Sequence, residues 1–227
     1  MLMIKGLIRS LFQTGFFAAV LLIPAGTWHW PRAIQFLVVF GLLSLISIVA
    51  LARFAPASLE ARVQRGAAKN QPAADRIVSL FIALSHLAWF VFIPIDVFRL
   101  HLLPPPQLWL SVVGAALFLL GYGIMLTSLF QNAFAAPVVG DQSERDQSVI
   151  DSGLYGRIRH PLYLGHLLFL TGLTLWLQSL PGLIALPIVF LPLVARILVE
   201  EKHLRETLPG YAEYMTQVPY RLVPLAW

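Results

Sequence analysis

A cluster of polar and aromatic residues surrounds the start of one apolar segment. The cluster consists of Tyr155, Arg159, His160 and Tyr163, and Pro161 stands among them as a residue favoured in the first turn of a helix. A helix start carries free backbone N–H groups and the positive end of the helix dipole. The cluster therefore predicts a site for an anionic group.

Each of these residues also has a plainer interpretation. Interfacial arginines can snorkel to lipid phosphates, and tyrosines are common interfacial anchors. His160 could simply be the cap of a helix whose first residue is Pro161. For any residue taken alone the plainer interpretation is favoured. The presence of all of them around one helix start favours a binding site.

A second group of ionisable residues ends the next apolar segment. Arg196, Glu200 and Glu201 lie in "ARILVEEKHL". Neighbouring glutamates point in different directions on a helix, so at most one of them can face a site directly. An Arg196–Glu200 surface pair would contribute only about 0.2–0.5 kcal/mol. Ionisable groups near a membrane tend to face the bundle interior, which favours a functional role.

Two further motifs have both a structural and a functional interpretation. Tyr211 and Tyr214 are three residues apart and share one helical face, as in a site wall or in an amphipathic interfacial helix. Gly121 and Gly123 could allow close helix packing or let a flat ligand approach the backbone. Packing is the default interpretation of a Gly-x-Gly inside a membrane helix.

The elements that must position these residues are apolar helices. Of the 227 residues, 58% are hydrophobic and 12% are charged, whereas an ordinary soluble domain is about 25% charged. A helix needs about 20 apolar residues to cross a bilayer. We expect an all-α, polytopic integral membrane bundle of five to six transmembrane helices with a cytosolic C-terminal helical cap. The expected spans are residues 7–28, 33–54, 77–98, 108–130, 161–177 and 183–199. The first is expected to be retained, because "LLIPAGTWHW" is a poor signal-peptide cleavage site.

The composition also excludes several kinds of site. The chain has no cysteine, so disulfides, thiolate nucleophiles and Cys-ligated metals are excluded, and we expect no metal. The net charge of +5 does not imply a nucleic-acid partner in a membrane protein, where the placement of charge matters more. We expect residues 1–106 to be an accessory scaffold and residues 107–227 to carry the site. The oligomeric state is left open.

Basic residues predict the orientation in the membrane. The two polar loops and the tail carry most of them, whereas the opposite side carries only Arg32 and Arg99. The positive-inside rule places both termini and the polar site in the cytoplasm. The basic residues used are Arg53, Arg62, Arg65, Lys69, Arg76, Arg145, Arg157, Arg159, Lys202, Arg205 and Arg221.

In this order, these motifs resemble the isoprenylcysteine carboxyl methyltransferase family. The likeness consists of "GLYGRIRHPLYLG", a hydrophobic hairpin, the Glu-Glu pair, the two tyrosines and "VPYRLVP", and it covers about residues 132–224. Phospholipid N-methyltransferases share a shorter version with a Pro-x-Tyr turn, a Glu-Glu pair and a Gly-x-Gly.

The resemblance implies S-adenosylmethionine as methyl donor, in a pocket open to the cytosol and built from the last two spans and the tail. The residues suit that molecule chemically. The Arg159–His160 helix start is suited to bind its carboxylate, and Glu200 or Glu201 is suited to bind its ammonium. The faces of the tyrosine rings are suited to contact its sulfonium and its adenine. The expected cofactor-binding residues are Tyr155, Arg159, His160, Pro161, Tyr163, Glu200, Tyr211, Tyr214 and Gly123.

Methyl transfer from a sulfonium is an in-line displacement, so the enzyme mainly positions and desolvates. A carboxylate acceptor needs no base, only a cation to place it, for which Arg196 is the candidate. An amine or thiol acceptor needs a base, and Glu201 or His160 could serve. We therefore expect Arg196 and Glu201 to be catalytic, and Arg196 and Asn132 to contact the acceptor. The family's "NF" appears here as "NAF", with one extra residue after Asn132.

Three functions fit these observations. The first is methyl transfer to a lipophilic carboxylate, such as a prenylcysteine, that enters sideways from the bilayer. The second is methyl transfer to a phospholipid amine or a thiol. The third is a non-catalytic membrane protein or transporter, for which charge should lie in mid-membrane. The charged motifs instead lie at the cytoplasmic rim, which favours an enzyme.

Overall fold

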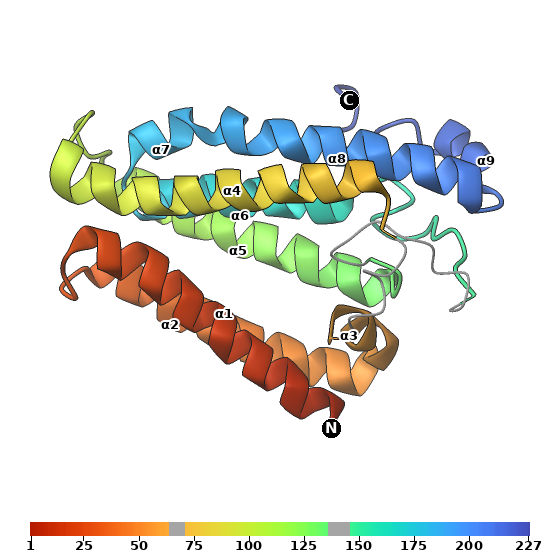
Figure 1. Cartoon of the computed structure of the whole chain (residues 1–227), viewed down its shortest axis with the longest axis horizontal. Helices are drawn as coiled ribbons and strands as arrows, with labels where there is room; N and C mark the ends of the chain where they lie inside the picture. The colour runs from red at the N-terminus through yellow and green to blue at the C-terminus, as the bar shows by residue number, and fades with distance from the viewer. Residues whose placement is uncertain (64–70, 136–145) are drawn as a thin grey trace.

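The computed structural model describes residues 1–63, 71–135 and 146–227, which form helices joined by loops, without strands (Figure 1). This confirms the all-α expectation. The long helices lie side by side, with α1 and α2 as a pair along one side of the bundle. The elements are α1 (Leu2–Ala25), α2 (Pro31–Phe54), α3 (Pro56–Val63), α4 (Ala73–Ile95) running into the π-helical turn η2 (Asp96–Leu100), α5 (Leu108–Gln131), α6 (Pro161–Trp176), α7 (Leu180–Ile184), α8 (Leu186–Thr207) and α9 (Tyr211–Gln217).

Five helical segments of the described chain are long and apolar enough to cross a membrane. They are residues 2–25, 31–54, 73–100, 108–131 and 180–207. The fifth expected span, residues 161–177, corresponds to α6, which is apolar but has only 16 residues. The expectation of a bundle with five to six such helices is confirmed. The helix α8 continues to Thr207, eight residues beyond the expected end of the last span at 199, because backbone hydrogen bonding continues where the apolar run stops.

The closest packing in the bundle joins α5 to α6 through four glycines. A Cβ atom on Gly172 would lie 2.5 Å from the carbonyl oxygen of Gly114, and one on Gly121 would lie 2.5 Å from that of Gly165. Real side chains cannot occupy such positions, so the two backbones are in direct contact. Small residues allow this approach between membrane helices. Gly121 therefore serves helix packing, the interpretation that the sequence favoured.

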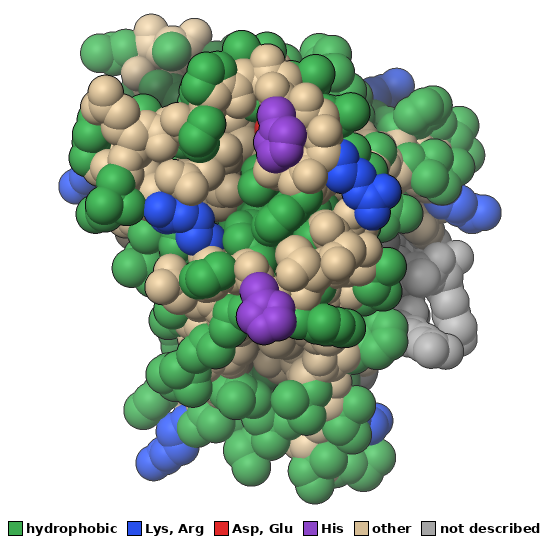
Figure 2. Space-filling model, turned by 90° about the vertical axis from the view of Figure 1, so that its left-hand side faces the viewer, with side chains coloured by type: hydrophobic (Ala, Val, Ile, Leu, Met, Phe, Trp, Pro, Cys, Tyr) green, Lys and Arg blue, Asp and Glu red, His purple; other side chains and the backbone are tan. Residues whose placement is uncertain are grey.

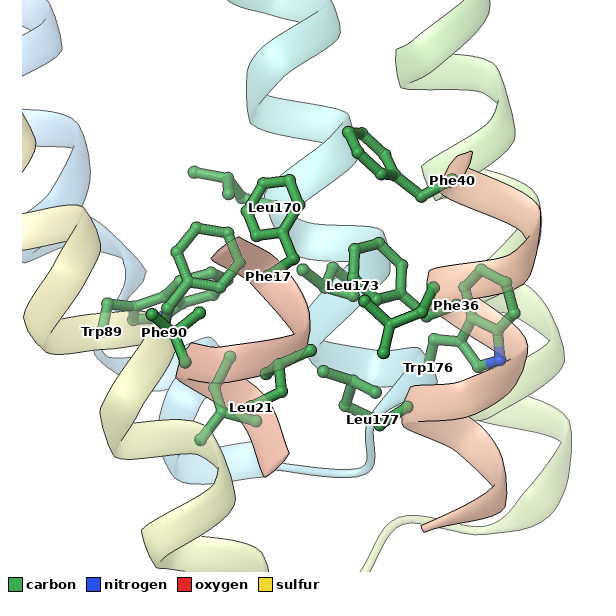
Figure 3. Packing of buried hydrophobic residues seen from close by; sticks show 14 of the residues in the cluster. Phe17, Leu21, Phe36, Phe40, Trp89, Phe90, Leu170, Leu173, Trp176 and Leu177 are labelled. Carbon is green, nitrogen blue, oxygen red and sulfur yellow. The ribbon is translucent and has the colours of Figure 1, made fainter. Parts of the chain in front are cut away.

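Aromatic and aliphatic side chains from α1, α2, α4, α5, α6 and α8 meet at the centre of the bundle (Figure 3). The ring of Phe17 on α1 lies 4.9 Å from that of Phe40 and 5.0 Å from that of Phe90. Phe36 on α2 lies 5.6 Å from Phe118 on α5. Such edge-to-face and tilted pairs are favourable arrangements of aromatic rings. This cluster connects the N-terminal helix pair to the α5–α6 pair.

The polar elements gather at one end of the bundle. The N-terminus, α3, the end of α5 and the α8–α9 region all lie at the right-hand end in Figure 1. The opposite end, seen in Figure 2, is mostly hydrophobic or uncharged, with few Lys and Arg side chains. The sequence predicted this asymmetry. Of the basic residues on which that prediction rests, Arg65, Lys69 and Arg145 lie outside the described residues.

Candidate active site

The start of α6 is held in place by the C-terminal tail. The backbone N–H of Arg159 donates to the carbonyl of Tyr220, and that of His160 donates to the carbonyl of Arg221, both at 2.9 Å. Pro161 then occupies the first turn of α6, as its residue type predicted. The tail thus fixes the position of the two residues that precede the helix.

Glu201 on α8 joins this helix start to α8 and to the tail. Its carboxylate accepts hydrogen bonds from Arg159 Nε at 2.7 Å, from Arg221 Nε at 2.9 Å and from His160 Nε2 at 3.1 Å. Arg159 also donates to the carbonyl oxygen of Val218 at 2.6 Å. Arg159, His160 and Glu201 are buried. A buried carboxylate with charged partners stabilises the arrangement that it connects, because the remaining charges would be left uncompensated without it.

Glu200 points elsewhere, as expected for neighbouring residues on a helix. Its carboxylate accepts a hydrogen bond from the Tyr163 hydroxyl at 2.8 Å. Glu200 and Tyr163 line a cavity, whereas Glu201 lies beside it and is not part of its wall. The sequence could not tell which glutamate faces the site; in the structure it is Glu200.

The cavity lies between the end of α5, the start of α6, the end of α8 and α9. Eight of the residues expected at the site line it: Asn132, Tyr155, Arg159, His160, Tyr163, Glu200, Tyr211 and Tyr214. The rest of its wall is formed by Phe134, Ala135, Gln147, Ser148, Val149, Ile150, Leu162, Leu204 and Leu208. The sequence did not single out these residues, because apolar residues and two polar loop residues carry no signal that separates a cavity wall from ordinary packing or an ordinary loop.

Tyrosines of α9 and of the loop before α6 form one side of the cavity. The Tyr214 hydroxyl donates to the carbonyl of Tyr155 at 2.8 Å, and the rings of Tyr211 and Tyr214 lie 5.6 Å apart. The side chain of Asn132 hydrogen-bonds to Tyr155. Burial raises the pKa of Tyr155, Tyr211 and Tyr214, so these phenols remain neutral. Neutral, electron-rich rings can contact a cation through their faces.

Gly123 is not at the cavity, which corrects its expected place among the cofactor-binding residues. It is exposed, and a Cβ atom placed on it would meet nothing within 4 Å. The reason is helical geometry. Gly121 faces α6, and a residue two positions later is rotated by about 200° around the helix, so it faces away.

Arg196 also lies outside the cavity wall. Its Nε is 3.7 Å from a carboxylate oxygen of Asp75 on α4, and its NH1 donates to Ser79 Oγ at 3.5 Å. Asp75 is fully buried and accepts a hydrogen bond from Gln71 at 2.6 Å. Asp75 was not among the predicted site residues, although an acidic residue at the start of an apolar run is costly unless it is paired.

Most of the cavity is built by one stretch of the chain, from α5 to the end of α8. Residues 109–209 match the phospholipid methyltransferase family model. That family is related to the isoprenylcysteine carboxyl methyltransferases, so the resemblance seen in the sequence is confirmed. None of the curated proteins compared with the chain matches it.

The stretch that matches the phospholipid methyltransferase family includes most of the cavity. The matched residues include all of α6 and α8 and nearly all of α5, and therefore Arg159, His160, Tyr163 and Glu200. The stretch ends before Tyr211 and Tyr214, which complete the cavity from α9. The match supports a methyltransferase, and the apolar helices indicate an integral, multi-pass protein in a lipid bilayer.

Proposed function

We propose that this protein is an S-adenosylmethionine-dependent methyltransferase that acts on a lipophilic acceptor at the membrane surface. The observation that supports this best is the cavity at the start of α6. One acidic residue, one arginine, one histidine and four tyrosines line it, and most of them lie inside the stretch that matches a methyltransferase family. Each charged part of the cofactor has a partner of suitable chemistry there.

The residues fit the cofactor as follows. The Glu200 carboxylate would hold the ammonium, and the tyrosine faces would contact the sulfonium and the adenine. Arg159 has five N–H donors, of which Glu201 and the Val218 carbonyl take two, so further donors can meet a carboxylate. The cofactor, when bound, would supply an electrophilic methyl group on its sulfonium.

The size of the cavity sets a condition on binding. Its volume is about 90 Å³, well below the roughly 300–1,000 Å³ of ligand pockets. A nucleotide-sized cofactor would therefore displace part of the wall. Residues 147–150 are part of the wall that lies outside the helices, so they can move without breaking helical hydrogen bonds. Cofactor binding should change amide hydrogen exchange in this segment.

We assign Glu201 a positioning role. Its carboxylate is turned toward Arg159, His160 and Arg221 and away from the cavity wall. It would hold the arginine and the histidine where they can meet the cofactor. Because the transfer is an in-line displacement, such positioning supplies much of what the reaction requires.

The candidate acceptors are a lipid amine, a lipophilic carboxylate and a lipophilic thiol. The carboxylate interpretation relied on Arg196 as the cation that places the acceptor, and Arg196 faces Asp75 and Ser79 on α4 instead. The match to a phospholipid methyltransferase family favours the amine. We therefore place a phospholipid amine first and a prenylcysteine-like carboxylate second. An amine must give up a proton when it is methylated, and His160, which lines the cavity, is our candidate base because Glu201 has the positioning role.

Calorimetry on the purified protein with S-adenosylhomocysteine tests the proposal. We expect saturable binding, and no binding would contradict the proposed function. Transfer of a labelled methyl group to phosphatidylethanolamine, to a prenylcysteine and to a lipophilic thiol would then identify the acceptor. Labelling of phosphatidylethanolamine is the expected result.

A further inference from the structure

A second, larger cavity lies between the N-terminal helices and α5. Its volume is about 670 Å³, within the range of pockets that hold small molecules. It is formed by residues of α1, α2, α3 and α5 and shares no lining residue with the first cavity. The lining residues are Gly6, Arg9, Ser10, Phe12, Gln13, Phe16, Phe40, Ser44, Ser47, Ile48, Leu51, Leu59, Arg62, Val63, Tyr122, Met125, Leu126 and Leu129.

Two arginines form a positively charged end of this cavity. The Arg9 guanidinium donates to the backbone carbonyl of Arg62, which brings the two residues together. The Nε atom of Arg62 is buried and has no hydrogen-bond partner in the described part of the chain. The pKa of Arg62 is lowered to about 10, mainly by burial, while Tyr155 raises it and the nearby charge of Arg9 adds to the lowering. Arg62 is therefore charged at neutral pH.

A buried polar atom at the same end also lacks a partner. Ser10 lines the cavity, is only 4% exposed, and its hydroxyl has no hydrogen-bond partner among the described residues. A buried hydroxyl without a partner costs free energy. An oxygen-rich anionic group would provide acceptors for both guanidinium groups and for this hydroxyl.

The rest of the wall is mainly apolar and opens toward the lipid side of the helices. Phe12 and Phe16 line the cavity and are 77% and 43% exposed, on a helix long and apolar enough to span the membrane. Leu126 and Met125 lie opposite on α5. A charged end joined to an apolar wall suits an amphiphile with one anionic head and hydrocarbon chains.

The charged end of this cavity adjoins the candidate active site. Leu129 of α5 lines the second cavity, and Asn132, three residues later, lines the first. Arg62 and Tyr155 are close enough to interact electrostatically, and Tyr155 lines the first cavity. A head group held by the arginines would therefore lie next to the residues proposed to bind the methyl donor.

We infer that this second cavity binds the lipid acceptor, with Arg9, Arg62 and Ser10 holding an anionic head group and α1, α2 and α5 enclosing the chains. The assignment of this lipid as acceptor rests on the proposed function. The binding chemistry is shared by a phosphodiester and a carboxylate head group. The inference gives the N-terminal helices, otherwise only a scaffold, a part in substrate binding.

Native mass spectrometry of the purified protein tests the lipid site directly. The probes are phosphatidylethanolamine, a prenylcysteine and an uncharged diacylglycerol. We expect one bound molecule of an anionic probe, which here means a probe with an anionic phosphodiester or carboxylate group, and at least tenfold less diacylglycerol at equal concentration. A higher occupancy by phosphatidylethanolamine than by prenylcysteine would identify the phosphodiester source, and the reverse would identify the carboxylate.

Variants separate a head-group site from general adsorption of lipid. The double variant Arg9→Gln/Arg62→Gln should lower occupancy by the anionic probe at least tenfold. Arg53→Gln, which removes an exposed arginine outside the cavity, is the matched control and should change nothing. Ser44→Phe should fill the cavity and lower occupancy without removing charge. Equal occupancy in the parent and in both cavity variants would overturn the inference.

Binding of S-adenosylhomocysteine to the same variants separates this inference from the proposed function. The arginine variants should bind it like the parent, which also shows that they are folded, and should transfer methyl groups at least tenfold more slowly. Lipid binding that depends on the arginines, in a protein that does not bind the nucleotide, would retain the lipid site and contradict the methyltransferase. Nucleotide binding together with lipid binding that does not depend on the arginines would retain the methyltransferase and contradict the lipid site.

Discussion

Adjacent residues on one helix, Glu200 and Glu201, carry different parts of the candidate site. Glu200 contacts Tyr163 and faces the cavity, whereas Glu201 is surrounded by Arg159, His160 and Arg221. A rotation of about 100° between neighbouring positions is enough to separate a ligand contact from a structural contact. The two glutamates should therefore respond differently to the same chemical change.

Glu200→Gln should weaken nucleotide binding with little effect on folding. A charge-assisted hydrogen bond contributes about 2 kcal/mol, so Kd for S-adenosylhomocysteine should rise roughly 30-fold. Calorimetry measures this change. Glu206→Gln, an exposed glutamate at the end of the same helix, is the matched control and should leave Kd unchanged. An unchanged Kd in Glu200→Gln would remove Glu200 from the ammonium site.

Glu201→Gln should destabilise the protein as well as slow methyl transfer. Weakening a buried ion pair by neutralising one partner costs about 3 kcal/mol, equivalent to roughly 6–12 °C in Tm for a chain of this size. Thermal unfolding in detergent measures this loss. Arg221→Gln removes one partner, which is 28% exposed, and should cost less. A variant with parental Tm and no transfer would instead support the catalytic role that the sequence predicted.

At the residue scale, sequence patterns predicted the cluster better than the direction of its members. The types and spacing of Tyr155, His160 and Tyr214 placed them at one site, and all three line the cavity. The direction of Arg196 could not be predicted, because it depends on Asp75 of α4, more than 100 residues earlier in the chain. Pairs formed between distant helices leave no local pattern.

Two packed helices, α5 and α6, determine where the cavity lies. Their glycines bring the backbones into contact, so the register of α6 along α5 is fixed by shape. Side chains larger than hydrogen at these positions would force the helices apart. Of the Gly-x-Gly pair recognised in the sequence, only Gly121 packs against α6. Gly114 and the partners on α6, Gly165 and Gly172, could not be assigned without the register.

Gly121→Ala and Gly123→Ala form a matched pair on α5. The first places a methyl group 2.5 Å from backbone atoms of α6 and should lower the free energy of unfolding by about 1–3 kcal/mol. The second meets open space and should be neutral or slightly stabilising, because alanine has the higher helix propensity. Thermal unfolding in one detergent compares them. Equal Tm values would show that α5 and α6 do not pack this closely.

The whole molecule is asymmetric along its long axis, with its polar elements at one end and a mostly uncharged opposite end (Figures 1 and 2). We propose that the polar end faces the cytosol. Composition alone indicates membrane helices, because apolar blocks of this length have few other uses. The orientation depends on loops, and their charges are the only sequence signal for it.

Single cysteines test the orientation in a chain that has none of its own. Lys202→Cys on α8 and Leu103→Cys in the loop before α5 are exposed positions at opposite ends. In intact cells, a membrane-impermeant maleimide should label Leu103→Cys and reach Lys202→Cys only after the membrane is opened. The reverse pattern would place the candidate site outside the cytosol.

The short length of α6 has a consequence for how deeply its first turn lies. From the Gly121–Gly165 contact, α5 continues for ten residues to Gln131, about 15 Å, while α6 reaches back only four residues to Pro161, about 6 Å. The first turn of α6 is thus recessed by about 9 Å relative to the tip of its neighbour. A lipid would reach this recessed helix start with its head group while its acyl chains stay in the bilayer. Methyl transfer would then not require the lipid to be extracted from the membrane.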